Sequence, residues 1–254
     1  MDGGVQSVRR ALHILRLLAE ERGTLGVTEI VRETGLPQAT VHRLLATLVD
    51  QGWVERSRYT ARYRFGPGIL GTTAVALAHA PLLERGRPVL ARLAATFGLD
   101  AYLSARVGRR VVFLERAAAG ERNDGFHPGI RQPAHCTAAG KALLAFLPAT
   151  EFQELYRDRP LLRRYTTRTI VEREALEQEL QAVREAGCAE DRGEFAERWR
   201  SIAAPVRSAD GRVIAALSCG GSVARMTHEQ TTALRGELLL QAEELSHQLG
   251  LSEE

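Results

Sequence analysis

Residues 27–48 carry the spacing of a helix-turn-helix, and this feature constrains the fold more than any other. Ile30 and Val31 form the apolar side of a first short helix, and Gly35 supplies a residue that takes a positive φ at the turn. Apolar residues then recur at helical spacing from Val41 to Leu48, which predicts a second helix with one apolar face. The alternative is an ordinary helical hairpin with a solvated polar face.

The opposite face of the second helix carries short or polar side chains, which suit base edges and phosphates. A helix presented in this way fits the major groove of DNA, which is about 12 Å wide. We therefore predict that this segment binds DNA. The candidate contacts are Gln38, Ala39, Thr40, His42, Arg43 and Thr47.

A basic hairpin follows the helix-turn-helix. Residues 52–56 and 62–65 predict two short strands joined by a turn at 58–60. No acid follows Glu55 in this stretch, and clustered arginines suit phosphates or a minor groove better than a solvated surface. Tyr59 and Tyr63 either contact sugars or pack the hairpin itself. The predicted cationic contacts are Arg56, Arg58, Arg62 and Arg64.

An amphipathic helix precedes the helix-turn-helix, with Ser7 as its expected N-cap. Its apolar stripe is expected to cover the back of the winged unit. The residues of this stripe are Val8, Leu12, Leu15, Leu17 and Leu18.

Length and composition bound the remaining possibilities. A chain of 254 residues is long enough for two compact domains, and a net charge of only +3 means that DNA binding depends on where the cations lie. Cys136, Cys188 and Cys219 are widely spaced, which predicts neither a disulfide framework nor a metal site. We identify no signal peptide and no apolar run that would span a membrane, so we expect a cytoplasmic protein. The single lysine among many arginines indicates a GC-rich, bacterial genome.

The chain changes character after the hairpin. The run Phe65–Gly68, with its glycines and proline, ends the hairpin. Residues 69–80 predict a short apolar helix that ends at Pro81. We expect this helix to link two domains and to pack against a partner subunit, because its apolar side chains would otherwise be exposed. The alternative is that the helix folds back on its own domain.

Residues 82–249 alternate between helices and hairpin strands. Helices are predicted at 82–97, 135–147, 150–156, 172–186 and 227–249, and strands at 99–107, 110–118, 201–207 and 213–218. Consecutive hairpin strands with helices gathered to one side describe an α+β sheet domain.

Four blocks of residues, taken in order, resemble the IclR family of bacterial transcription regulators over nearly the whole chain. The blocks are Gln6–Val8 with the winged segment, Thr40–Leu45, Pro133–Leu144, and Ile202–Val206 with Ala216–Ser218. The resemblance implies an N-terminal winged helix-turn-helix domain (1–66), a linker helix that mediates dimerisation (67–81) and a C-terminal effector-sensing domain of GAF-like fold (82–254). It also implies a homodimer or homotetramer on operator DNA, acting as a repressor in preference to an activator. A small organic acid would be the effector, with no cofactor or metal.

Carried over position by position, the resemblance places the effector pocket at the helix start near residue 137 and on the strands beyond it. Backbone N–H groups at a helix start favour a carboxylate, and serine hydroxyls on adjacent strands can donate hydrogen bonds. The alternative for each residue taken singly is core packing, which is the usual role of buried serine and alanine residues on strands. The implied effector contacts are Ala138, Ala139, Gly140, Asp191, Ser201, Ser218 and Gly220.

The chain departs from the family pattern at two places. Gly220 stands where relatives often have a hydroxyl, and the run Arg198–Arg200 stands where a small residue is common. An inward-facing Trp199 or Arg200 would favour an aromatic or doubly charged acid. A loop at 126–132 is expected to cover the pocket, with further candidate walls at Phe126, Ile130 and Arg131.

Two other classes of protein remain as alternatives. A small-molecule-processing enzyme built on the C-terminal domain would use His135 and Cys136, since a helix start lowers the pKa of a thiol. Adjacent residues rarely face each other, however, and no third group is evident to orient them. The seven histidines show no metal-ligand spacing. A protein-interaction module is disfavoured by the arginine-rich hairpin.

Overall fold

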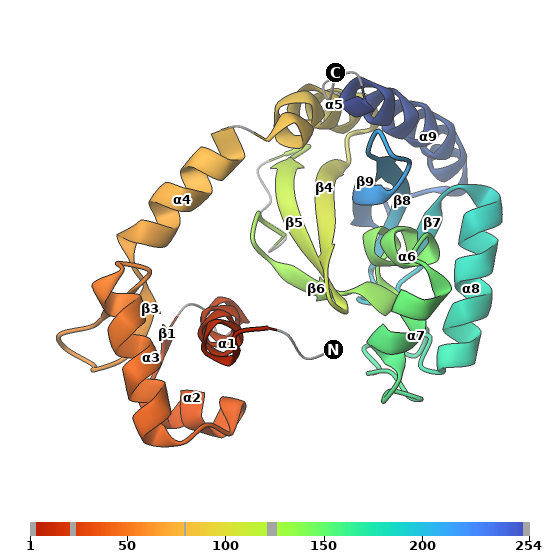
Figure 1. The fold of residues 1–254 in the computed structure, drawn as a ribbon. Helices are drawn as coiled ribbons and strands as arrows, with labels where there is room; N and C mark the ends of the chain where they lie inside the picture. Colours follow the sequence, from red (N-terminus) through yellow and green to blue (C-terminus); the bar gives the residue numbers. More distant parts are fainter. Residues whose placement is uncertain (1–3, 21–23, 79, 121–125, 251–254) are drawn as a thin grey trace. The chain divides into compact units, whose positions relative to one another are not determined.

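The computed structural model describes residues 4–20, 24–78, 80–120 and 126–250 of the chain (Figure 1). The chain divides into two compact units, one ending at residue 79 and the other beginning at residue 80. The helix expected as a linker is therefore grouped with the first unit. We describe each unit by itself.

The N-terminal unit is a winged helix-turn-helix, as the sequence predicts. A three-stranded antiparallel sheet, in the order β1-β3-β2, packs beside three helices. The strand β1 has only two residues, too few to show any periodicity in the sequence. The elements are α1 (Gln6–Glu20), β1 (Thr24–Leu25), α2 (Val27–Thr34), α3 (Gln38–Asp50), β2 (Val54–Arg56) and β3 (Tyr63–Phe65).

The turn between α2 and α3 forms where the sequence places it. Gly35 has φ 64°, and its N–H donates to the Val31 carbonyl at 2.9 Å, which ends α2. Pro37 immediately precedes the first residue of α3. The side chains of Ile30, Val41 and Leu45 are fully buried and join the helices in one core.

The prediction for α1 is partly wrong. Val8 and Leu12 are 54% and 46% exposed, whereas Ile14, which the predicted stripe omits, is fully buried. Leu17 and Leu18 are buried as expected. Ser7 lies inside the first turn of α1, because the helix begins at Gln6, one residue before the predicted cap.

The helix α4 (Pro67–Ala78) begins directly after the wing. The backbone N–H of Gly68 donates to the Gly52 carbonyl at 2.9 Å, and a Cβ at Gly66 would lie 2.3 Å from the same oxygen. Glycine is therefore required where the chain leaves the wing. Leu70 and Val75 on α4 are 68% and 63% exposed, so packing against a partner subunit stays a prediction.

The C-terminal unit is an α+β domain built on one six-stranded antiparallel sheet, in the order β6-β5-β4-β9-β8-β7. A 3-10 turn at Ala134–Cys136 leads into α6. The elements are α5 (Pro81–Phe97), β4 (Asp100–Val107), β5 (Arg110–Ala117), β6 (Arg131–Pro133), α6 (Ala138–Ala145), α7 (Ala149–Tyr156), α8 (Arg173–Ala186), β7 (Ala189–Asp191), β8 (Trp199–Arg207), β9 (Val213–Ser222) and α9 (His228–Gly250).

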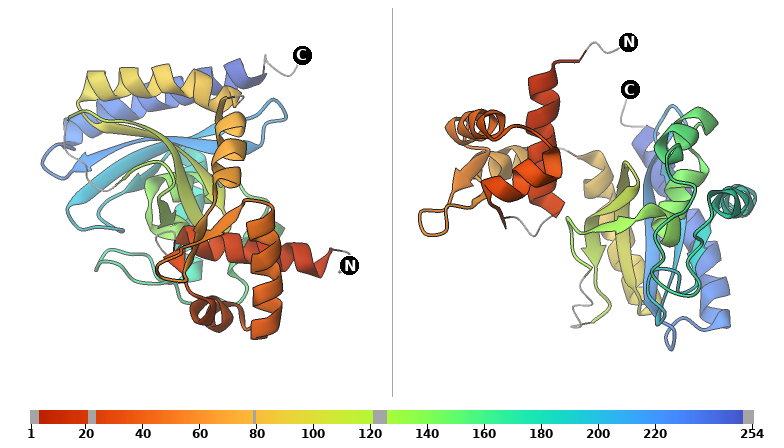
Figure 2. Two further views of the ribbon diagram at one scale, coloured as in Figure 1. Left: turned by 90° about the vertical axis from the view of Figure 1, so that its left-hand side faces the viewer. Right: turned by 90° about the horizontal axis from the view of Figure 1, so that it is seen from below.

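Helices cover both faces of this sheet, which corrects the expectation of a single helical layer. α5 and α9 lie side by side on one face, and α6 with α8 behind it covers the other (Figures 1 and 2). Successive residues of a strand point to opposite faces, so Ile202 of β8 packs under α5 and α9 while Ala203 packs under α6. The central strands are consequently apolar on both sides.

The helix expected at 135–147 is interrupted at Thr137. Thr137 has φ −126°, an extended conformation, and its Oγ1 accepts a hydrogen bond from the Gly140 N–H at 3.2 Å. This cap makes Ala138 the first residue of α6. The short strands β6 and β7 were not predicted, and β7 carries Asp191 to the edge of the sheet beside Ser201.

Candidate functional site

The exposed face of α3 presents the residues that the sequence assigns to DNA. Gln38, Ala39, His42, Arg43 and Thr47 are exposed, and Thr40 is half-buried. The hydroxyl of Thr47 donates to the Arg43 carbonyl at 3.1 Å, one turn earlier. The exposed face is thus lined by short or polar side chains around one arginine, and the opposite side of α3 packs in the domain core.

The four wing arginines are not equivalent, which the sequence does not reveal. Arg62 pairs with Glu29 of α2 at 2.8 Å and donates to the Thr24 carbonyl at 3.2 Å, so it ties the wing to the domain. Arg64 pairs with Glu55 on the neighbouring strand. Among the described residues, no carboxylate pairs with the exposed side chains of Arg56 and Arg58. These two cations remain available to a phosphate backbone.

The two tyrosines of the wing lie in different surroundings. Tyr63 is buried in the domain core, and the Arg56 guanidinium lies 6.0 Å from its ring centre. Tyr59 at the tip is 98% exposed. Of the two tyrosines, Tyr63 therefore packs the hairpin.

A small cavity lies between the start of α6 and the sheet of the C-terminal unit, with a volume of about 20 Å³. Alternate residues of β8 and β9 point toward α6, and this alternation brings Ser201 and Ser218 to the same face. Five of the seven predicted effector residues line the cavity. The complete lining is Tyr102, Phe113, Phe126, Gln132, Thr137, Ala138, Ala139, Asp191, Trp199, Ser201 and Ser218.

The start of α6 supplies backbone donors to this cavity. The first N–H groups of a helix have no acceptor within the helix, and the helix dipole adds positive potential there. Because Thr137 already satisfies the Gly140 N–H, the N–H groups of Ala138 and Ala139 remain for a ligand. Methyl side chains at both positions leave the backbone accessible. This end of the cavity suits an anion.

Several polar side chains in the cavity wall have no hydrogen-bond partner among the described residues. Gln132 and Ser218 are 94% and 97% buried, and neither side chain makes a hydrogen bond to any residue that the structure describes. The Ser201 hydroxyl is likewise unpaired within the described part of the chain. Because these three side chains line the cavity and pair with no described residue, they can form hydrogen bonds with a bound molecule.

Asp191 closes one side of the cavity. Its Oδ1 accepts from the backbone N–H groups of Gly193 at 3.0 Å and Glu194 at 2.7 Å. Burial raises the pKa of Asp191 to about 7, although the N–H of Glu194 and the Lys141 ammonium act in the opposite direction. The carboxyl can therefore donate or accept a hydrogen bond near neutral pH.

The other two predicted effector residues lie outside the cavity lining and serve packing. A Cβ at Gly140 would lie 2.1 Å from the Ala134 carbonyl oxygen, so this glycine lets α6 contact the turn before it. A Cβ at Gly220 would lie 2.9 Å from the Trp199 ring. Glycine at position 220 therefore makes room for the indole.

Trp199 faces the cavity, whereas Arg200 lies on a different surface. Arg200 lines a neighbouring pocket of about 280 Å³ together with Glu190, Arg192 and Arg235. Asp191 and Ser201 line both this pocket and the cavity. Of the three further wall candidates, Phe126 lines the cavity, and Ile130 and Arg131 do not. Sequence reasoning missed Tyr102 and Phe113, because identifying them requires the register that pairs Tyr102 with Ser218.

The side chains of His135 and Cys136 are both buried. The His135 ring nitrogen Nε2 lies 3.0 Å from the Arg163 carbonyl, and burial lowers the pKa of this histidine. Burial also raises the pKa of the Cys136 thiol well above its usual range, so the thiol stays protonated. In the described ranges of the chain, no group of three or more histidine, cysteine or acidic residues could hold a metal ion.

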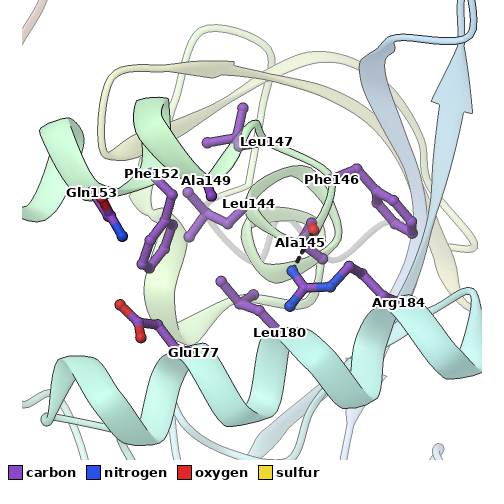
Figure 3. Close-up of a pocket in the computed structure, with 10 residues that line it drawn as sticks. All are labelled: Leu144, Ala145, Phe146, Leu147, Ala149, Phe152, Gln153, Glu177, Leu180 and Arg184. Carbon is purple, nitrogen blue, oxygen red and sulfur yellow. Dashed lines mark hydrogen bonds between the residues drawn. The ribbon is translucent and has the colours of Figure 1, made fainter.

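A larger pocket of about 490 Å³ lies between the end of α6, α7 and α8 (Figure 3). Its walls are mainly apolar, with Leu144, Phe152 and Leu180 pointing into it. The Arg184 guanidinium at its edge already donates to the Ala145 carbonyl at 2.7 Å and to Gln181. None of the predicted effector residues lines this pocket.

Comparison with known proteins identifies both units. Residues 7–58 match the IclR helix-turn-helix domain, and residues 74–247 match the family described as bacterial transcriptional regulator IclR C-terminal. The chain is 34% identical to the HTH-type transcriptional regulator BhcR of Paracoccus denitrificans, with 96% of this chain and 88% of BhcR covered. It is 28% identical to the transcriptional repressor IclR of Escherichia coli, with 96% and 90% covered.

Solved structures agree with this assignment. An IclR transcriptional regulator from Alicyclobacillus acidocaldarius superposes with a TM-score of 0.82 at 27% identity, covering 97% of this chain and all of the other. Across the described residues, we find no helix with the length and apolar character that a membrane span requires. The chain belongs to the IclR family of bacterial transcriptional regulators, with an N-terminal DNA-binding helix-turn-helix and a C-terminal effector domain.

Proposed function

We propose that this regulator responds to a small organic acid bound in the cavity at the start of α6. The observation that carries the proposal is the meeting of backbone donors at Ala138 and Ala139 with the unpaired side chains of Gln132, Ser201 and Ser218. A carboxylate is held by the helix start, and the remaining polar groups satisfy other oxygens of the acid.

On the DNA side, the exposed face of α3 lies in the major groove. Arg43 is the side chain on that face with the reach and donors to read a guanine edge. Arg56 and Arg58 of the wing contact phosphates, because no protein carboxylate among the described residues neutralises them. Arg62 holds the wing in place and contributes less to DNA affinity.

The two sites are coupled by linkage in a homodimer or homotetramer. An effector changes operator affinity only if it binds the DNA-competent and incompetent forms unequally. The exposed apolar side chains of Leu70 and Val75 support dimerisation through α4, which sets the spacing of two α3 helices on half-sites. Several relatives are named repressors, which supports repression as the mode of action.

A thermal-shift screen of mono- and dicarboxylic acids against the full chain tests this proposal. At least one acid should raise the melting temperature of the wild-type protein and change its affinity for the DNA upstream of its own gene. The same acid should leave the melting temperature of Ser218→Phe unchanged, since the phenyl group fills the cavity. If no acid in the screen shifts the wild-type protein, the proposal is wrong.

A further inference from the structure

The ring of Phe126 occupies a box of aromatic side chains. It stacks on Trp199 with ring centres 4.8 Å apart and an interplanar angle of 29°. It meets Phe113 and Tyr102 edge-on, at 5.9 Å and 6.1 Å between ring centres. These are the favoured geometries for aromatic pairs, so the box is shaped for one flat six-membered ring.

Phe126 is only partly buried, and residues 127–129 that follow it are exposed. The segment after Phe126 is held to β5 by the Gly129 N–H, which donates to the Phe113 carbonyl at 2.8 Å. Moving this side chain therefore breaks no buried hydrogen bond that the structure describes. Its ring forms part of the cavity wall, and the cavity volume of about 20 Å³ has room for about one water molecule. A larger ligand therefore needs a side chain of the wall to move.

The charges around the cavity limit what can bind. Among the residues that line it, none is an arginine or lysine, and Asp191 is the one acidic side chain. The start of α6 can stabilise one carboxylate through N–H groups and the helix dipole. A second carboxylate would be desolvated without a cation among the lining residues to pair with it, which is strongly unfavourable.

We propose that the effector is an aromatic monocarboxylic acid whose ring replaces that of Phe126 against Trp199 while its carboxylate reaches the start of α6. This inference rests on the proposed function, because it uses the same carboxylate position. Gln132 and Ser218 then face the ring and pair with polar substituents on it. The departure from the family pattern at Trp199 and Gly220 supplies the stacking surface.

Comparison of flat and saturated acids tests the proposal. Benzoate and its three monohydroxy isomers are titrated into the full chain by calorimetry beside cyclohexanecarboxylate, which has the same carbon skeleton without the flat ring. At least one aromatic acid should bind roughly 2- to 12-fold more tightly than cyclohexanecarboxylate, the range that favourable ring stacking gives. Phe126→Ala should bind this acid more tightly than the wild type does, because the competing ring is gone.

A matched variant and a local probe complete the test. Phe146→Ala removes a ring that faces Arg207 and lies outside the cavity lining, and it should leave the affinities unchanged. In a Trp53→Phe background, Trp199 is the remaining tryptophan, so 5-fluorotryptophan labelling gives one ¹⁹F resonance that reports on the cavity wall. The binding aromatic acid should shift this resonance.

The outcomes distinguish failure of the aromatic inference from failure of the proposed organic-acid response. Equal affinity for cyclohexanecarboxylate and the aromatic acids, with no gain in Phe126→Ala, overturns the aromatic inference and leaves a carboxylate effector in place. Failure of all these acids to bind either protein also overturns it. In that case, a thermal shift with an aliphatic or dicarboxylic acid keeps the proposed function, and the lack of any shift removes both.

Discussion

The ammonium group of Lys141 donates to Glu194 at 2.6 Å between Nζ and Oε1, and both side chains are buried. Lys141 is the only lysine of the chain, and its Nζ also lies 2.7 Å from Oε1 of Glu179. The Glu194 backbone N–H in turn donates to Asp191 in the cavity wall. The buried ion pair therefore anchors the segment that positions Asp191.

Lys141→Met should destabilise the C-terminal unit by about 3–5 kcal/mol, because it leaves the carboxylate of Glu194 buried without its cation. Denaturant unfolding followed through Trp199 in the Trp53→Phe background measures this loss. Glu179→Gln is the matched control. Its side chain is 35% exposed, so the loss should be about 1 kcal/mol or less. Equal losses for the two variants would contradict the anchoring role of Glu194.

Asp191 should make stability depend on pH in the acidic range. Burial raises its folded-state pKa to about 7, from 3.8 in the unfolded chain, so the folded protein keeps a proton that the unfolded chain releases. The contribution of protonated Asp191 to the free energy of unfolding is therefore complete below about pH 4 and is lost as the pH rises to about 7. Relative to Asp191→Asn, the wild-type free energy of unfolding should fall by about 1.4 kcal/mol per pH unit in this window. Parallel curves for the two proteins would refute the raised pKa.

Gly220→Ala should disturb the cavity without any change of charge. The added Cβ would lie 2.9 Å from the Trp199 ring and 3.0 Å from the Ser201 Cβ, so the indole must move at a cost of about 1–3 kcal/mol. The ¹⁹F resonance of labelled Trp199 should shift. Gly236→Ala is the control, since nothing lies within 4 Å of its added Cβ on α9, and it should stabilise the protein by about 1 kcal/mol. An unshifted Trp199 resonance in Gly220→Ala would contradict the packing described.

Arg43 and Arg58 should affect DNA binding in different ways. Arg43→Ala should cost about 1–3 kcal/mol on the operator and relax specificity at one base pair, if its guanidinium reads a base edge. Arg58→Ala should weaken binding to all sequences and reduce the slope of log K against log salt by about one. Arg159 is an exposed arginine of the C-terminal unit, and Arg159→Ala should change neither the affinity for DNA nor its salt dependence. A uniform loss for Arg43→Ala would make it a phosphate contact.

Local patterns were sufficient to predict the helix-turn-helix. Gly35 requires a left-handed conformation, and the apolar residues of α3 repeat at helical spacing, so no distant contact is needed to place them. The pairing of Arg62 with Glu29 was not predictable, since 33 residues separate them in the chain and only the fold brings them to 2.8 Å. The difference between paired and unpaired wing arginines follows from tertiary structure.

Some of the cavity residues were predicted, because the family resemblance covers the start of α6 and the strands β8 and β9. The aromatic box was not predicted, because its four rings come from four separate segments of the chain. These rings belong to Tyr102, Phe113, Phe126 and Trp199. The second helical layer was missed because strands buried on both faces lose the alternation that would reveal which side is covered. Strands of three residues, such as β7, are too short to show a period.

The most direct test titrates DNA from the region upstream of the gene with the full chain at low ionic strength, with and without each acid of the thermal-shift screen. The account predicts binding whose affinity changes at least about fivefold with one acid. Ser218→Phe should bind the DNA normally and ignore that acid, whereas Ser222→Phe, at the exposed end of β9, should respond as the wild type does. Absence of DNA binding under every condition, or an unchanged acid response in Ser218→Phe, would contradict it.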